Sequence, residues 1–137
     1  MASKAQMSGM RGVYLVAAEL ARLGFIASPT SRSAQGADIL VTDQRCQRAY
    51  SVQVKTKTRP DTFWLLKKDT KKQVSKSHLF VFVNIKNTKG TEEVQFFPVP
   101  SRIVASRMVG ARGRFPNIKR DRLFEFRNKW SCFGKAL

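Results

Sequence analysis

Apolar residues recur every three or four positions near the start of the chain. They are Val13, Val16, Ala17, Leu20 and Leu23. This spacing puts one apolar stripe along an α-helix that faces a core. Gly24 suits the end of such a helix, because glycine tolerates the backbone conformation that follows a last helical turn. We therefore expect a helix over residues 9–23, preceded by eight frayed residues.

Two short strands with a polar turn between them are expected next. Residues 39–41 are apolar, and residues 50–55 alternate between apolar and polar side chains, as in a strand with one buried face. Gln53 and Lys55 share the polar face of the second strand. A turn of this length brings Asp38, at the head of the first strand, close to that face. An acid, an amide and a lysine are thus predicted to converge.

The remaining pattern predicts three further strands and a second helix. The strands are expected over residues 63–66, 79–85 and 93–99, and the helix over residues 101–109, with Ser101 as its N-cap. The middle strand is a dense run of apolar, aromatic and β-branched residues, so we expect it to be buried on both faces. The basic stretch before it is expected to be an exposed loop or helical turn.

These elements predict an α/β fold in which the N-terminal helix packs on a mixed sheet of four or five strands, with a second helix after the last strand. A length of 137 residues fits one domain that spans residues 1–137 and buries a real core. We expect that core over about residues 9–109 and a basic C-terminal extension over residues 110–137. The hydrophobic content of 42% excludes a disordered chain.

The motif Ala37-Asp38 … Gln53-Val54-Lys55 resembles the signature of the PD-(D/E)xK nuclease superfamily, with glutamine in place of the second acid. Helix, strand, hairpin and lysine strand also follow one another in the order that this fold requires. The superfamily includes Holliday-junction resolvases and several restriction enzymes. The resemblance covers about residues 9–109 and implies a restriction-endonuclease-like core.

The same resemblance implies a metal-dependent DNA endonuclease that hydrolyses phosphodiester bonds with Mg²⁺ or Mn²⁺. Asp38 would hold the metal, and Gln53 and the peptide carbonyl of Val54 would complete the coordination, because hard cations take oxygen ligands. Lys55 would stabilise the charge that develops on phosphorus or help to deprotonate the attacking water. Asp38 is the only carboxylate in this set, so the empty site should bind metal weakly.

The first helix departs from the family pattern. Family members often carry a glutamate about eleven residues before the Gly-Phe pair, and here that position is Val13. Glu19 is the acid that this helix offers, six residues later. Glu19 either substitutes as a fourth catalytic residue or is a solvated helix residue. The loss of the helix acid raises the alternative of a nuclease fold without catalysis.

The net charge of +17, from 26 Lys and Arg against 9 acids, favours a polyanionic partner, most simply DNA. Phosphates need positive density, and exposed aromatic rings can stack on unpaired bases. The expected nucleic-acid-binding residues are Arg32, Lys57, Arg59, Trp64, Lys67, Lys68, Lys71, Lys72, Arg112 and Arg114. Each of them is otherwise an ordinary solvated side chain, or, for Trp64, a core residue.

Three function classes stay open at this point: the endonuclease, a catalytically inactive nucleic-acid-binding protein of the same fold, and a basic RNA-associated protein. The resemblance also allows a homodimer, although the sequence identifies no interface. No apolar run reaches the ~18 residues of a membrane span. Two cysteines, Cys46 and Cys132, give neither a disulfide framework nor a metal cluster, so we expect a reduced, cytoplasmic protein.

Overall fold

The protein is described by a computed structural model that covers residues 1–31, 36–60, 62–110 and 115–137. Its helices and strands are α1 (Lys4–Arg22), β1 (Ile26–Pro29), β2 (Ile39–Thr42), β3 (Ala49–Lys57), β4 (Phe63–Leu65), β5 (His78–Thr88), β6 (Thr91–Pro100), α2 (Ser101–Arg107) and β7 (Asn117–Lys119). Short 3₁₀ turns are η1 (Lys68–Lys72), η2 (Arg120–Arg122), η3 (Phe124–Phe126) and η4 (Trp130–Phe133).

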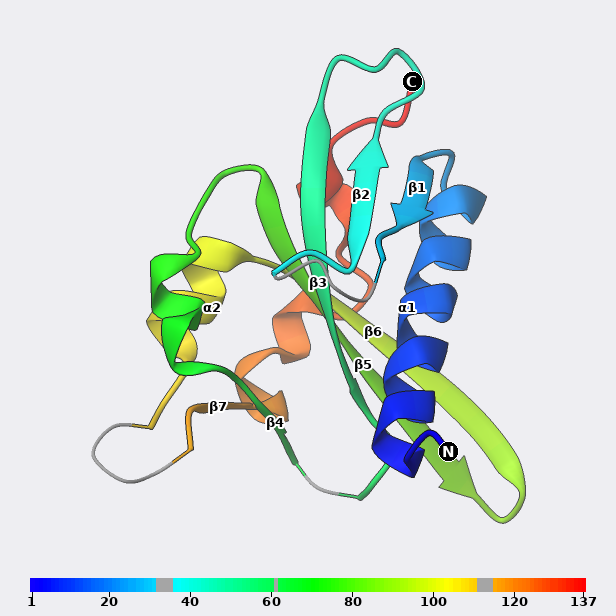
Figure 1. The fold of residues 1–137 in the computed structure, drawn as a ribbon, viewed down its shortest axis with the longest axis vertical. Coiled ribbons are helices and arrows are strands. Elements are labelled where there is room, and N and C mark those ends of the chain that lie inside the picture. Colours follow the sequence, from blue (N-terminus) through cyan, green and yellow to red (C-terminus); the bar gives the residue numbers. More distant parts are fainter. Residues whose placement is uncertain (32–35, 61, 111–114) are drawn as a thin grey trace.

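Five strands form one mixed sheet in the order β1-β2-β3-β5-β6 (Figure 1). Neighbours pair antiparallel except β3 and β5, which run parallel with Gln53 opposite Phe80 and Lys55 opposite Phe82. Strands β4 and β7 make a second, two-stranded sheet. The predicted α/β class, the mixed sheet and the helix after the last large strand are confirmed.

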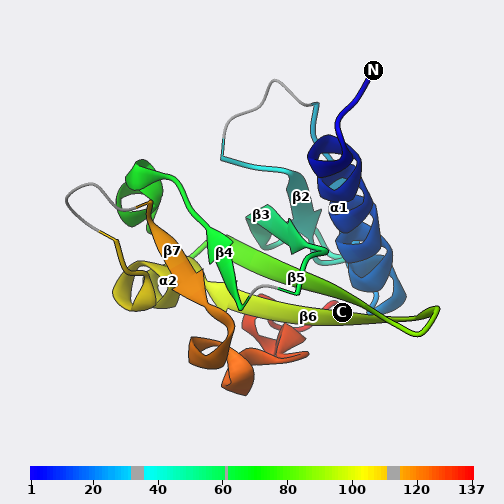
Figure 2. The same ribbon diagram turned by 90° about the horizontal axis from the view of Figure 1, so that it is seen from below.

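The large sheet has a hydrophobic cluster on each face. One cluster joins α1 to the sheet through Val16, Leu20 and Val52, and the other joins β4, β7 and α2 to it through Trp64, Phe80 and Phe82. Figure 2 shows α1 and β4 on opposite sides of β3. Strand β5 contributes to both clusters and is buried from His78 to Ile85, which confirms the expectation of a strand covered on both faces.

Helix α1 begins earlier than its apolar stripe suggests. Ser3 is its N-cap: the Ser3 hydroxyl accepts a hydrogen bond from the Gln6 amide, and the Gln6 side chain accepts one from the Ser3 amide. This reciprocal capping box satisfies two backbone donors that would otherwise be unpaired. The expectation of eight frayed residues was therefore wrong. None of the helices in the described ranges combines the length and apolar character needed to cross a membrane.

The expected N-cap of α2 was also wrong. Helix α2 starts at Ser101, but the Ser101 hydroxyl accepts a hydrogen bond from the Ser75 amide at 3.0 Å and donates one to the Ser75 carbonyl at 2.9 Å. The serine is buried, so it satisfies the backbone of the loop before β5 instead of the helix start. This contact ties α2 to the segment that leads into the central strand.

Candidate functional site

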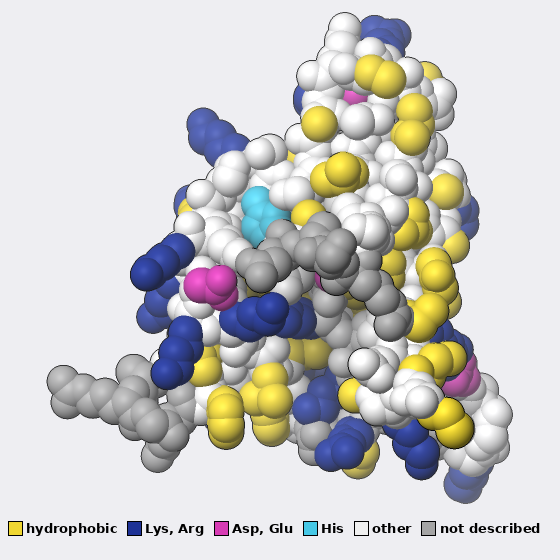
Figure 3. Space-filling model, in the orientation of Figure 1, with side chains coloured by type: hydrophobic (Ala, Val, Ile, Leu, Met, Phe, Trp, Pro, Cys, Tyr) yellow, Lys and Arg dark blue, Asp and Glu magenta, His cyan; other side chains and the backbone are white. Residues whose placement is uncertain are grey.

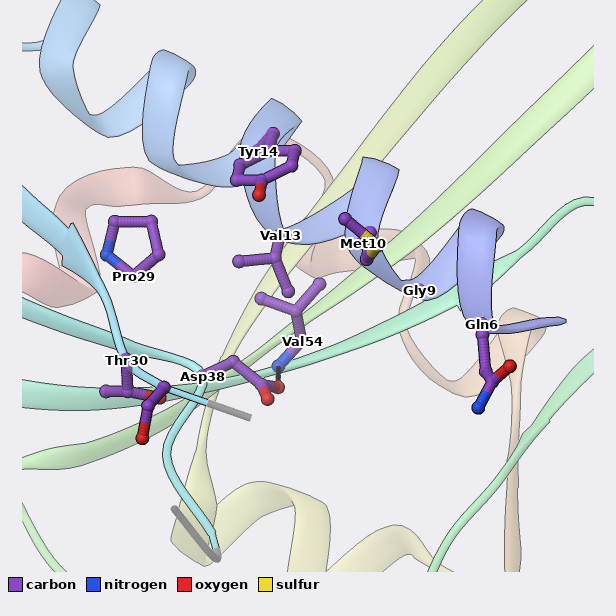
Figure 4. A pocket seen from close by; sticks show the side chains of 10 residues that line it. Gln6, Gly9, Met10, Val13, Tyr14, Pro29, Thr30, Asp38 and Val54 are labelled. Atoms are coloured by element: carbon purple, nitrogen blue, oxygen red, sulfur yellow. Dashed lines mark hydrogen bonds between the residues drawn. The ribbon is translucent and has the colours of Figure 1, made fainter. Parts of the chain in front are cut away.

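Asp38 lies at the point where β3 continues past the beginning of β2. The Asp38 amide donates to the Val52 carbonyl at 2.8 Å, and the Val54 amide donates to Asp38 Oδ2 at 2.7 Å (Figure 4). Thr30 holds the preceding backbone, because its amide donates to the Asp38 carbonyl and its hydroxyl to the Ala37 carbonyl. The carboxylate is thus fixed at the open edge of β3 by the pairing geometry itself.

The backbone of Val54 adds a second oxygen to this edge. In an antiparallel strand the amide and carbonyl of one residue point to the same side, and the Val54 amide points at Asp38. Its carbonyl therefore faces the Asp38 edge as well. The side chains of Gln53 and Lys55 project from the face of β3 opposite to the Val54 side chain, since side chains alternate along a strand. The structure thus brings the predicted Asp38, Gln53, Val54 and Lys55 to one stretch of β3.

The amine of Lys55 is half-buried among other charges. Burial lowers the pKa of Lys55 from its ordinary value, and the ammonium of Lys67 lowers it further, whereas the carboxylates of Asp38 and Asp69 raise it. Asp38 is therefore close enough to Lys55 to interact with it. A lysine with a lowered pKa is in the neutral amine form more often than a solvated one, and only that form can accept a proton.

Asp69 was not recognised from the sequence. It lies in η1, and its carboxylate interacts electrostatically with Lys55 although 14 residues separate the two in the chain. The one sequence signal was that Asp69 is the single acid within the basic stretch over residues 67–76. Its proximity to Lys55 depends on how the chain returns from β4, which no local pattern specifies.

A pocket of about 270 Å³ opens beside Asp38 on the α1 side. Helix α1 contributes Gln6, Met10, Val13 and Tyr14 to its wall, and Asp38 and Val54 line the opposite side. Figure 4 shows Val13 pointing toward Val54 and Asp38. The side chain at the position where the family pattern has an acid therefore does face the site, but here it is a hydrocarbon.

Glu19 does not reach this pocket. It lies six residues beyond Val13 on α1, about 9 Å further along the axis, and its carboxylate accepts a hydrogen bond from Arg22 Nε at 3.1 Å. The pKa of Glu19 is lowered mainly by this bond to Arg22. The interpretation of Glu19 as a substitute site acid was wrong, because it forms a surface ion pair within its own helix.

The donor atoms at the Asp38 edge fit a hard divalent cation. The Asp38 carboxylate and the Val54 carbonyl are oxygen donors at this edge, and the Gln53 amide is an oxygen donor on the adjoining face of β3; Mg²⁺ is commonly held by one or two carboxylates together with substrate phosphates. Within the described ranges, no three residues among His, Cys, Asp and Glu come together as a metal cluster. The fit is therefore to a metal that the phosphate of a substrate helps to hold.

His78 lies on the same face of the sheet as Gln53, opposite Ser51 in the β3–β5 register. The Ser51 hydroxyl and His78 Nδ1 are 2.7 Å apart, and His78 Nε2 is buried with no hydrogen-bond partner among the described residues. Burial lowers the pKa of His78 from its ordinary value, and the contact with Ser51 opposes that shift. Only 8% of the residue is exposed, so His78 is a buried side chain of the sheet.

Most of the expected nucleic-acid-binding residues between positions 57 and 72 lie at the surface. Arg59, Lys67, Lys68, Lys71 and Lys72 are exposed, and the Lys57 ammonium lies over the Phe63 ring at 4.3 Å. Figure 3 shows lysine and arginine side chains over η1 and the lower part of this face, with few acids among them. Arg32, Arg112 and Arg114 lie outside the described residues.

Trp64 was expected to contact nucleic acid, and that expectation was wrong. Its residue exposure is 3%, its ring packs on Phe82 and Phe97, and its indole N–H donates to the Val83 carbonyl at 3.1 Å. A ring that is buried and hydrogen-bonded in this way is part of the core between β4 and the large sheet. It cannot stack on a base without unfolding that core.

No family model matches the chain, and no curated protein matches it. Among solved structures, the chain is similar to a Holliday junction resolvase, Hjc, from the archaeal hyperthermophile Archaeoglobus fulgidus. The two share 14% sequence identity with a TM-score of 0.60, over 93% of this chain and 96% of the resolvase. The similarity extends over nearly the full length of both chains. The chain therefore has the α/β restriction-endonuclease-like fold of this nuclease.

Proposed function

We infer that the protein is a metal-dependent DNA endonuclease that hydrolyses phosphodiester bonds. The observation that carries this inference is the position of the Asp38 carboxylate, which is bonded to the Val54 amide and interacts with Lys55. A carboxylate at a strand edge, beside an amide oxygen, a carbonyl and a half-buried lysine, is the arrangement that the Asp…Gln-x-Lys motif predicts. The nuclease fold of the chain supports the same conclusion.

Asp38, Gln53 and the Val54 carbonyl would hold Mg²⁺ or Mn²⁺ beside the scissile phosphate. When bound, such an ion supplies stabilisation of negative charge and a nucleophilic water at neutral pH. Lys55 binds the phosphate oxygens and stabilises the charge that develops on them. Since the protein supplies a single carboxylate to the metal, the phosphate must add negative charge, and metal and DNA should each tighten the binding of the other.

The exposed lysines of η1 lie beside this site and would guide the DNA backbone to Lys55. A second copy of the chain would be needed to cut two strands at once, and a homodimer is part of the proposal on that ground. The described cysteines, Cys46 and Cys132, are both free, which suits a cytoplasmic protein.

A second candidate function is a DNA-binding protein that has lost catalysis. The observation that favours it is Val13, which points into the pocket beside Asp38 from the position of the missing acid. Gln53 likewise replaces a carboxylate by a neutral amide. In this alternative the fold and the positive charge are retained for binding alone.

Cleavage of supercoiled and branched DNA with Mg²⁺ or Mn²⁺ tests the endonuclease. The variants are Lys55→Ala and Asp38→Asn, because an asparagine oxygen can still accept the hydrogen bond from Val54. Asp121→Asn and Lys129→Ala are matched controls at exposed positions. Metal-dependent cleavage by the wild type and the two controls, lost in the two site variants, is the expected result.

Three other outcomes separate the alternatives. If no protein cleaves but all of them bind DNA in a salt-sensitive manner, the inactive binding protein is the correct interpretation. If cleavage persists in Asp38→Asn and Lys55→Ala, it comes from elsewhere and this site is not an active site. Tighter binding of single-stranded RNA than of any DNA would favour the basic RNA-associated protein.

A further inference from the structure

A second hollow, of about 410 Å³, lies at the far end of β3 from Asp38. Its lining includes Arg59 after β3, Lys86 on β5 and Arg120 at the start of η2. The rest of the lining consists of four polar, uncharged residues and two apolar ones: Thr58, Asn84, Asn87, Thr88, Pro60 and Ile85. No acid is among the lining residues in the part of the chain that the structure describes. Three cations from three separate segments therefore border one polar depression.

Two of the three segments, those of Lys86 and Arg120, are anchored by the fold. The Arg120 amide donates to the Thr62 carbonyl at 2.7 Å, and the β4–β7 pairing holds the strand that precedes Arg120. Lys86 is part of the β5–β6 ladder, and the buried Asn84 beneath it donates to Gln95 at 3.1 Å. Strand pairing thus sets where Lys86 lies relative to Arg120. Figure 3 shows blue side chains along this lower rim, where Figure 1 has the β3–β4 connection and the β5–β6 turn.

The hollow continues the line of cations that begins at the candidate active site. Lys55, Lys57 and Arg59 are alternate residues along β3 and its continuation, so the first two share one face of the strand. Four residues of extended chain span about 13 Å. The backbone of one DNA strand winds around the helix axis, so neighbouring phosphates lie further apart than the axial rise of about 3.4 Å, and this distance spans fewer than four nucleotides.

We propose that the hollow formed by Arg59, Lys86 and Arg120 binds one backbone phosphate of the nucleic acid, to one side of the bond at Lys55. The position of the bond relative to the hollow rests on the proposed function, whereas phosphate binding itself does not. A nucleic acid held at both points must run along β3. The hollow therefore fixes the direction in which the nucleic-acid strand crosses the site. Cleavage would then require a substrate that extends from the bond at Lys55 toward the hollow.

Salt-dependent binding of a fluorescent duplex tests this assignment without any cleavage. Affinity is measured by anisotropy between 50 and 300 mM KCl, without divalent metal, for the wild type, Lys86→Ala, Arg120→Ala and the double variant. Arg102→Ala and Lys129→Ala are the controls, because both residues are exposed, lie outside the hollow and change the net charge equally. Circular dichroism verifies that each variant is folded, and Arg59→Ala provides a third variant at an exposed position.

The hollow variants are expected to weaken binding several-fold more than the controls. Because both cations contact the same phosphate, the double variant should lower the log–log salt slope by about 0.9, the value for one phosphate, rather than by about twice that amount. The proposal is overturned if the hollow variants match the controls, or if the wild type shows no salt-dependent binding. Salt-dependent binding with the expected slopes but without cleavage would remove the endonuclease and leave the phosphate site standing.

Discussion

Val13 is the side chain at which the pocket beside Asp38 departs from the family pattern. It lines the pocket beside Asp38 from the helix position at which the family pattern has an acid. A carboxylate there would add one negative charge next to the Asp38 oxygens. Metal affinity rises with the number of charged oxygen ligands, so the consequence of this single hydrocarbon is open to direct measurement.

Val13→Glu is expected to tighten the binding of Mn²⁺, without nucleic acid, by on the order of tenfold. Isothermal titration calorimetry on the wild type and the variant measures this change. Val13→Gln is the control, because it has the same length and no charge. Equal affinities for Val13→Glu and Val13→Gln would mean that the α1 position does not reach the metal.

His78 gives the protein a pH dependence at mildly acidic pH. Burial lowers its pKa in the folded state, so the unfolded chain takes up the proton more readily. Stability should therefore fall as the pH drops through the ordinary histidine value of 6.5. The urea midpoint of the wild type, followed by circular dichroism, is expected to be lower at pH 5.5 than at pH 7.5.

His78→Asn removes this titration and is expected to flatten the difference between the two pH values. The ion pairs of Glu19 and Glu92 do not change stability between pH 5.5 and 7.5. The pKa values of both carboxyl groups are lowered from 4.5, so these ion pairs lose their contribution to stability only under more acidic conditions. An equally steep pH dependence in His78→Asn would assign the effect to another group.

At the scale of elements, the site depends on how closely α1 approaches β3. Gly12 is buried against Thr56, and a Cβ atom at Gly12 would overlap Thr56 Oγ1. One turn earlier, Gly9 has no atom within 4 Å of its would-be Cβ. The close approach at Gly12 brings Val13 to the pocket beside Asp38. The packing of α1 therefore excludes a side chain at Gly12 but leaves room for one at Gly9.

Gly12→Ala is expected to destabilise the protein by roughly 1–3 kcal/mol, because the helix must move off the strand. Gly9→Ala is expected to stabilise it by about 0.5–1 kcal/mol, since alanine favours the helix and meets nothing there. Urea denaturation at one pH compares the two variants. If both substitutions change the free energy of unfolding in the same direction, the Gly12 contact does not control the packing of α1.

Those parts of the fold that depend on local pattern were predictable. The alternation over residues 50–55 and the apolar run over residues 79–85 correspond to β3 and β5. The three-residue strand β7 was missed, because its partner β4 lies more than 50 residues earlier in the chain. The burial of Trp64 could not be predicted from the sequence. Its neighbours in β4 are also apolar, so no alternation of polar and apolar residues showed which side chain faces the core.

The candidate site was predictable as far as the motif reached. Asp38, Gln53, Val54 and Lys55 are neighbours through one hairpin, and a turn and two strands suffice to place them together. The prediction that Glu19 substitutes for the missing acid failed because of helix geometry. Six residues rotate a side chain by about 600° around the helix axis, so Glu19 points about 120° away from the direction of Val13. Whether an acidic side chain of this helix can reach the site depends on that angle, and the composition of the helix alone does not reveal the angle.

At the scale of the whole molecule, the C-terminal segment closes the core against which the site is built. Phe133 is fully buried and its ring packs on Phe25 and Tyr50, which belong to the other end of the chain. The Gln44 amide also donates to the Ala136 carbonyl at 2.8 Å. The basic C-terminal extension expected from the sequence therefore includes residues that complete the hydrophobic cluster under α1.

Phe133→Ala is expected to lower the free energy of unfolding by about 3–5 kcal/mol, because it leaves a large cavity in that cluster. Phe124→Ala is the matched control: Phe124 is 60% exposed, so the change should stay within about 0.5 kcal/mol. Chemical denaturation measures both. A small effect at Phe133 would mean that the C-terminal segment folds independently of the sheet.

The hydrogen bond from the Val54 amide to Asp38 has an evolutionary consequence. The carboxylate closes the exposed edge of β3, and an asparagine oxygen would serve that structural purpose equally well. One base change in the Asp38 codon would thus end the proposed phosphodiester hydrolysis while the sheet and the positively charged surface persist. Gln53 already stands where the family pattern has an acid. Under the proposed function, a single mutation with little effect on stability would therefore convert this protein from one that cuts DNA into one that only binds it.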